Sequence, residues 1–128
     1  MAEDGAEVYE ARGVENPRIV DLVTYDADAR EVVLAILERR PWNGGRPQLE
    51  EHEEKLNSYF GYVLDGHLGR QYPQYAGLRV RIELRCPEAP GPREQPFFQA
   101  AEQYAASEGL RLTVAVTPDP FADRAPWE

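Results

Sequence analysis

Three side chains of this sequence could serve as metal ligands or nucleophiles. They are His52, His67 and Cys86, the only histidines and the only cysteine among 128 residues. The histidines are too far apart for a metal motif with two histidines one helical turn apart and a helper glutamate. Cys86 could act as a nucleophile only if a histidine came within hydrogen-bond reach. The pattern favours a structural cysteine and two histidines on a helix, one at the core edge and one at the cap. It indicates no metal, no cofactor and no catalytic set.

A second group of residues could bind an anion. Arg79, Arg81 and Arg85 alternate with apolar residues and therefore project from one face of a strand. Asp21 lies in another apolar segment, where a carboxylate needs either a hydrogen-bonding partner or an open face. We expect Arg79 or Arg81 to pair with Asp21 across the sheet. The alternative is a small-anion site on the arginines, with Asp21 or Glu83 as a base.

Four glutamates could contact a basic partner. Glu50, Glu51, Glu53 and Glu54 flank His52 in one run. Such a run is typical of the solvated start of a helix, where negative charge interacts favourably with the helix dipole. The alternative is an acidic docking strip for a basic protein.

Several aromatic residues fall outside the simple helical and strand patterns. They are Trp42, Tyr62, Tyr72 and Tyr75. Tyrosine and tryptophan are enriched at interaction hot spots, so these four residues are candidates for partner binding. The alternative is that they pack the loops onto the edge of the sheet.

Two strands open the part of the chain that should fold. Residues 19–25 are rich in β-branched side chains, and residues 32–37 form a short apolar run. The polar connector at residues 26–30 has the length of a hairpin loop. We expect the two strands to pair antiparallel.

Two helices are predicted from apolar spacing. The first spans about residues 47–65, with Gly66 able to adopt the left-handed cap, and its inward face comprises Leu49, His52, Leu56, Phe60, Val63 and His67. The second begins near Pro96, which suits a first helical turn, and ends at Gly109. Its predicted inward residues are Phe97, Ala101, Tyr104 and Ala105.

Two further strands complete the fold. Residues 78–86 and 110–116 alternate apolar and polar side chains, and the second helix between them makes a βαβ unit with parallel strands. Half-polar strand faces indicate that helices cover one side only. The predicted fold is an α+β two-layer sandwich, a mixed four-stranded sheet with two helices on one face in the order ββαβαβ. Its open face would present Arg79, Arg81, Arg85, Arg111 and Thr113.

The chain length fits one domain. Residues 1–16 read as a flexible acidic arm, residues 17–117 as a single α/β domain, and residues 118–128 as a proline-rich tail.

Charge excludes one class of partner. The 23 acidic and 14 basic residues give a net charge of -9 and a pI near 4.7, a field that repels nucleic acid. No apolar run has the length of a membrane span, the first residues are acidic rather than signal-like, and the lone cysteine gives no sign of an oxidising compartment. We therefore expect a cytoplasmic protein. Lys55 is the only lysine, a bias typical of a GC-rich bacterial genome.

A family resemblance rests on a series of short segments. These are residues 14–21, the hairpin into Val32-Val33-Leu34, Trp42, Leu56-Asn57-Ser58-Tyr59, and Tyr72-Pro73 before a strand. Over residues 14–117 the sequence resembles a small bacterial family catalogued only as a domain of unknown function. The resemblance implies a bacterial origin and this fold layout. It implies no activity, substrate or catalytic residue.

Two classes of function follow from these observations. The first, which we favour, is a non-enzymatic protein-interaction module of an accessory or immunity type, bound to another, basic protein. The alternative is a small enzyme or small-anion-binding protein that uses the open sheet face. A homodimer is compatible with both.

Overall fold

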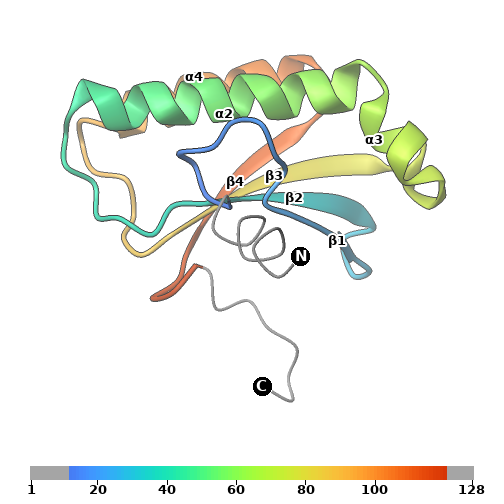
Figure 1. Cartoon of the computed structure of the whole chain (residues 1–128), viewed down its shortest axis with the longest axis horizontal. Coiled ribbons are helices and arrows are strands. Elements are labelled where there is room, and N and C mark those ends of the chain that lie inside the picture. Colours follow the sequence, from blue (N-terminus) through green and yellow to red (C-terminus); the bar gives the residue numbers. More distant parts are fainter. Residues whose placement is uncertain (1–11, 121–128) are drawn as a thin grey trace, which may run out of the picture.

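The computed structural model describes residues 12–120, which form one mixed β-sheet with helices on a single face (Figure 1). The elements follow in the order β1 (Leu22–Asp26), β2 (Glu31–Leu37), α2 (Arg46–Leu64), α3 (His67–Gln71), the 3-10 helix η1 (Pro73–Tyr75), β3 (Arg79–Cys86), α4 (Gln95–Ser107) and β4 (Arg111–Val116).

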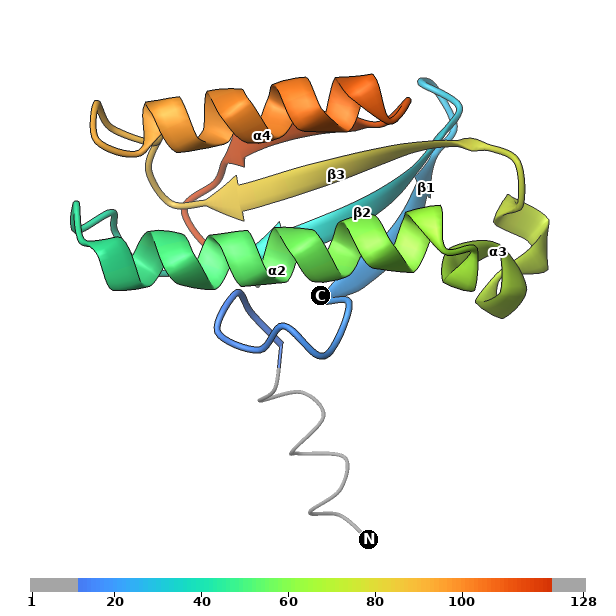
Figure 2. The ribbon, with the colours of Figure 1, turned by 90° about the horizontal axis from the view of Figure 1, so that it is seen from above.

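The sheet order follows the chain order, β1-β2-β3-β4. β1 and β2 form the antiparallel hairpin, whereas β2, β3 and β4 are parallel and are joined through α2 and α4. Crossovers of this kind share one hand, so two crossovers that advance in the same direction place both helices on the same face. Figure 2 shows α2 and α4 side by side over that face. The predicted two-layer α+β fold is confirmed.

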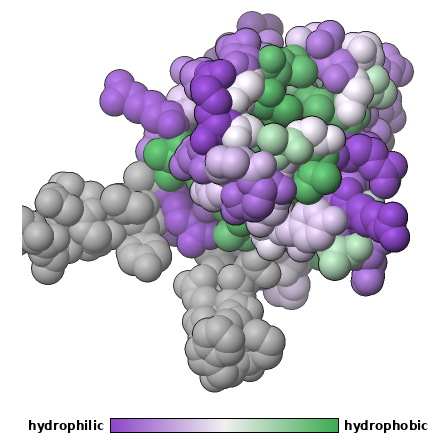
Figure 3. Space-filling view, turned by 90° about the vertical axis from the view of Figure 1, so that its right-hand side faces the viewer, coloured by the Kyte–Doolittle hydropathy of each residue, from purple (hydrophilic) through white to green (hydrophobic). Residues whose placement is uncertain are grey.

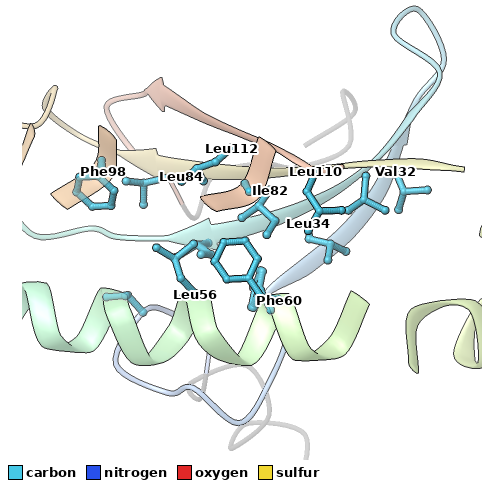
Figure 4. Close-up of a cluster of buried hydrophobic side chains, with 14 of the residues drawn as sticks. Val32, Leu34, Leu56, Phe60, Ile82, Leu84, Phe98, Leu110 and Leu112 are labelled. Carbon is cyan, nitrogen blue, oxygen red and sulfur yellow. The ribbon is translucent and has the colours of Figure 1, made fainter. Parts of the chain in front are cut away.

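The main apolar core lies between the helices and the sheet. Leu56 and Phe60 of α2 point toward Leu34 and Ile82 of the central strands (Figure 4). The alternation of β3 is confirmed, because its apolar residues are buried and its charged residues are more exposed. The spacing of apolar residues therefore predicts this interface well.

Helix α4 is rotated relative to the prediction. Its buried residues are Phe98 and Ala105, whereas Phe97 is half-buried and Tyr104 remains 48% exposed. Phe97 and Phe98 are consecutive residues, so the apolar spacing alone does not decide which of the two faces the sheet. The predicted inward position of Tyr104 is wrong.

The end of α2 agrees with the sequence, but the next elements were not predicted. Gly66 adopts a left-handed conformation with φ of +86°, which allows the chain to turn after α2. The short helices α3 and η1 follow, and His67 lies on α3 rather than on the face of α2.

The segment before β1 is tied to the fold by a buried lysine. Lys55 Nζ of α2 donates hydrogen bonds to Asp21 Oδ1 at 2.8 Å and to the backbone carbonyls of Ile19 and Asn16. The side chains of Lys55 and Asp21 are both fully buried. Burial lowers the pKa of Lys55, and the Asp21 carboxylate opposes that shift. Three acceptors match the three ammonium hydrogens, so the site is suited to charged lysine.

Asp21 also binds backbone groups of residues that precede and follow it in the chain. Its carboxylate accepts hydrogen bonds from the N–H groups of Gly13 and Leu37. The predicted pairing of Asp21 with Arg79 or Arg81 is therefore wrong, because the partners come from α2 and the backbone.

Residues 12–16 belong to the folded body. Val14 is 1% exposed within the core, and its backbone N–H donates to the Leu37 carbonyl. The predicted boundary at residue 17 is therefore too far along the chain. The rest of the predicted arm, residues 1–11, and residues 121–128 of the predicted tail lie outside the described residues.

No helix within residues 12–120 is both long and apolar enough to cross a membrane.

We expect the substitution Lys55→Met to reduce the free energy of unfolding by about 3–5 kcal/mol, because it leaves the Asp21 carboxylate buried without its cation. Urea unfolding at pH 7 would measure the loss. The exposed Arg46→Met on the same helix is the control and should be nearly neutral. A Lys55→Met protein as stable as the Arg46→Met control would show that the buried pair does not hold the segment.

Candidate functional site

The open face of the sheet carries the predicted arginines, but carboxylates already bind them. Arg81 contacts Glu31 at 2.8 Å and Asp26 at 3.1 Å, and Arg85 contacts Glu83 at 2.7 Å. Arg111 also reaches Glu31, at 3.1 Å. Burial would lower the pKa of Arg81, but its hydrogen bonds with Asp26 and Glu31 raise it.

This arrangement gives little support to an anion site. Three arginines of the open face share three carboxylates, so their charges balance, and Arg79 donates to the Ala29 carbonyl. Asp21, the predicted companion of these arginines, lies against α2 instead. A ligand-binding role for Arg79, Arg81 and Arg85 stays a prediction.

A buried polar cluster lies where β2 ends. The Glu38 carboxylate accepts hydrogen bonds from Arg40 at 2.9 Å, from Gln48 at 3.0 Å and from His52 Nε2 at 3.0 Å. Burial alone would raise the pKa of Glu38, but these hydrogen bonds outweigh it and lower the pKa to about 2. Glu38 is therefore a charged structural centre at neutral pH.

His52 is sealed within this cluster. Its ring lies 5.1 Å from Trp42 and 5.4 Å from Phe98, measured between centroids, and the side chain has no exposure. The predicted position at the core edge is wrong, because Trp42 and Phe98 cover the ring. Its Nδ1 atom has no hydrogen-bond partner within residues 12–120.

Trp42, predicted to bind a partner, has a packing role in this structure. It is half-buried, and its indole N–H donates to the Glu88 carbonyl across the loop that follows β3. The partner-binding role of Trp42 stays a prediction, and the packing alternative accounts for its contacts.

Cys86 and His67 offer little chemistry. Burial, followed by the nearby charge of Glu38, raises the pKa of the Cys86 thiol to about 11, so the thiol is protonated at neutral pH. His67 lies on α3, where its Nδ1 contacts Arg70. Among residues 12–120, no group of three or more potential ligands could hold a metal ion.

The predicted tyrosines gather at the far end of α2 from Trp42. Tyr75 stacks on Tyr25 at 6.0 Å and contacts Tyr72 at 5.7 Å, while Tyr62 hydrogen-bonds Gln71. Apolar patches at this end of the molecule lie between hydrophilic side chains (Figure 3). The 19 residues of α2 span about 28 Å, so the predicted aromatic residues do not form one surface.

The acidic run forms a ridge on the outer side of α2. Glu50, Glu53 and Glu54 are exposed, and none has an ion-pair partner in the part of the chain that the structure describes. Glu51 differs, because it is half-buried and binds Arg40 at 2.6 Å. We call Glu50, Glu53 and Glu54 the acidic ridge.

An apolar groove lies beside the acidic ridge, between α2 and α4. Its volume is about 250 Å³, and it is lined by Glu53, Leu56, Asn57, Phe60, Phe97, Ala100, Ala101 and Tyr104. The rings of Phe60 and Tyr104 meet edge to face at 4.9 Å across it. The groove therefore combines an apolar floor with one acidic wall.

Among the buried polar residues of α2, sequence reasoning placed His52 on the inward face but missed Gln48 and Lys55. Gln48, His52, Lys55 and Tyr59 recur every three or four positions, which places them on one face of α2. That spacing was a usable signal, but polar residues are usually assigned to solvent. Glu38 carried no periodic signal at all, since it follows directly after an apolar strand.

The comparisons with known proteins give one result. The model of a family of unknown function, DUF6572, matches residues 12–118. Neither the curated proteins nor the solved structures contain a significant match.

We expect Glu38→Gln to remove a pH-dependent part of the stability. The pKa of Glu38 is about 2 in the folded state, whereas a glutamate in the unfolded chain has the ordinary value of 4.5. The native state therefore binds fewer protons than the unfolded state between these two pH values. The stabilisation is present above about pH 5 and is lost as the pH falls toward 2. It is on the order of 3 kcal/mol at pH 7.

Urea unfolding between pH 7 and pH 3 would measure this difference. The Glu38→Gln protein should lose stability at pH 7 and show a flatter pH dependence than the wild type. An exposed control, Glu108→Gln, should keep the wild-type slope. If the free energy of unfolding depended on pH equally in Glu38→Gln and the wild type, the lowered pKa of Glu38 would be contradicted.

Proposed function

We propose that this chain, which belongs to the family of unknown function DUF6572, is a non-enzymatic protein-interaction domain that binds a basic partner through helix α2. The observation that carries the proposal is the acidic ridge. Its three exposed carboxylates lie within five consecutive residues of α2, whereas the carboxylates of Asp21, Glu31 and Glu83 are bound to lysine or arginine. The exposed Glu88, Glu102 and Glu108 are spread along the chain and form no such cluster.

Charge complementarity supports a basic partner. The chain has a net charge of -9, so the unpaired ridge lies in a field that already attracts cations. An unpaired surface carboxylate contributes little to folding, since even paired surface charges contribute about 0–1 kcal/mol. The ridge is therefore available for recognition at little cost to the fold.

The arrangement of reactive groups supports a binding role over catalysis. Lys55 is occupied by three acceptors, His52 is buried against Glu38, and the thiol of Cys86 is buried and protonated. A general acid, base or nucleophile must reach its substrate, and these groups face the interior. An accessory or immunity-type role, in which binding is the activity, agrees with this arrangement.

The setting that we propose is the bacterial cytoplasm. The predominance of arginine over lysine and the single buried cysteine support it. Self-association of the domain stays a prediction.

We expect the triple substitution of the acidic ridge, Glu50→Gln, Glu53→Gln and Glu54→Gln, to reduce partner capture by about tenfold or more at low salt. The measurement is a quantitative pull-down with the tagged full chain from lysate of the source organism, at low and moderate salt. Moderate salt should also weaken capture by the wild type, because screening acts on exposed charges.

The matched control removes three exposed carboxylates elsewhere, through Glu88→Gln, Glu102→Gln and Glu108→Gln. It has the same net charge as the ridge variant, so it separates a local surface from a general field. Equal loss in both variants, or no specific protein captured by the wild type at either salt, would contradict the proposal.

A further inference from the structure

The groove between α2 and α4 leaves apolar surface partly exposed on the helical face of the domain. Tyr104 is 48% exposed, Phe97 and Ala101 are half-buried, and Ala100 is exposed. Leu56 and Phe60 form the buried floor, at 3% and 6% exposure. An apolar groove of this kind between two helices can receive the apolar side chains of another element.

The size of the groove points to side chains rather than a small molecule. Pockets for drug-sized ligands run to about 300–1,000 Å³ and enclose most of the ligand, whereas this groove holds about 250 Å³ and is open to solvent. From Phe97 to Tyr104 it extends about 10 Å, the length of two helical turns. Side chains at positions i, i+4 and i+7 of a helix cover that length.

The charges on the two walls differ. The α2 wall carries Glu53 and is continuous with Glu50 and Glu54 of the acidic ridge, whereas α4 contributes Ala100 and Ala101. An occupant therefore gains from positive charge along one side only. That asymmetry selects both the chemistry of the occupant and its orientation.

We propose that the groove holds an amphipathic helix of the basic partner protein, with its apolar stripe against Phe60, Phe97 and Tyr104 and its arginines or lysines along the acidic ridge. This inference rests on the proposed function and specifies the partner's chemistry. The apolar stripe supplies the contact area, and the one-sided charge sets the direction of the helix.

The test uses a fluorescent helical peptide of about 15 residues, with leucine at i, i+4 and i+7 and arginines along one flank of that stripe. Two comparison peptides replace either the leucines by serine or the arginines by glutamate. Fluorescence anisotropy with the full chain should show binding by the leucine–arginine peptide. Each comparison peptide should bind at least about tenfold more weakly. Shifts in the backbone NMR spectrum should fall on α2 and α4.

Two matched variants locate the site on the protein. Ala100→Trp fills the groove from an exposed position and should weaken binding of the leucine–arginine peptide by about tenfold. Ala106→Trp adds the same ring at an exposed position of α4 outside the groove, and should bind as the wild type does. The triple substitution Glu50→Lys, Glu53→Lys and Glu54→Lys should reverse the preference and favour the leucine–glutamate peptide.

Several results would overturn the inference. One is equal binding of the leucine and serine peptides, another is a wild-type affinity for Ala100→Trp, and a third is the absence of binding by all three peptides. If capture from lysate still required the acidic ridge, the docking function would remain and only the groove would be excluded. If capture did not require the ridge, the proposed function itself would fail.

Discussion

The ion pair between Lys55 and Asp21 joins three parts of the fold that are distant in sequence. It links α2 to the segment before β1, and through the backbone N–H of Leu37 it also reaches the end of β2. Two charges without solvent exposure are costly unless hydrogen bonds satisfy them, and here they do. Tyr59 extends the network, because its hydroxyl donates to Ala35 and accepts from Asp21 N–H. The pairing thus specifies where the N-terminal segment must lie.

The inner and outer sides of helix α2 make different contacts. The side toward the sheet carries the apolar contacts of Leu56 and Phe60 and the polar contacts of His52 and Lys55. The outer side carries the acidic ridge, which contributes no ion pair to the described fold. Because the inner contacts fix the helix, its outer surface is held in place, which would limit the entropy lost if a partner bound there.

Periodic patterns allowed the fold to be predicted, and isolated polar residues did not allow the site to be predicted. The alternation in β3 and the apolar spacing in α2 report which side is buried, so the order of the elements and the placement of the helices on one face followed. The order of the strands within the sheet did not follow from these patterns. Asp21 carries no such pattern, and the apolar spacing of the helix does not point to its partner Lys55. The groove was also beyond prediction, because it depends on whether Phe97 or Phe98 faces the sheet, a difference of one residue that periodicity leaves open.

The burial of the only lysine makes it a natural reporter of opening in the native protein. Amine-directed reagents can reach the Lys55 side chain only when the segment around Asn16 and Ile19 separates from α2. The rate at which the side-chain amine of Lys55 is modified, located by peptide mass spectrometry, would therefore report local unfolding of this segment. Carboxylate-directed reagents can instead reach the exposed glutamates on the outer side of α2 without any such opening.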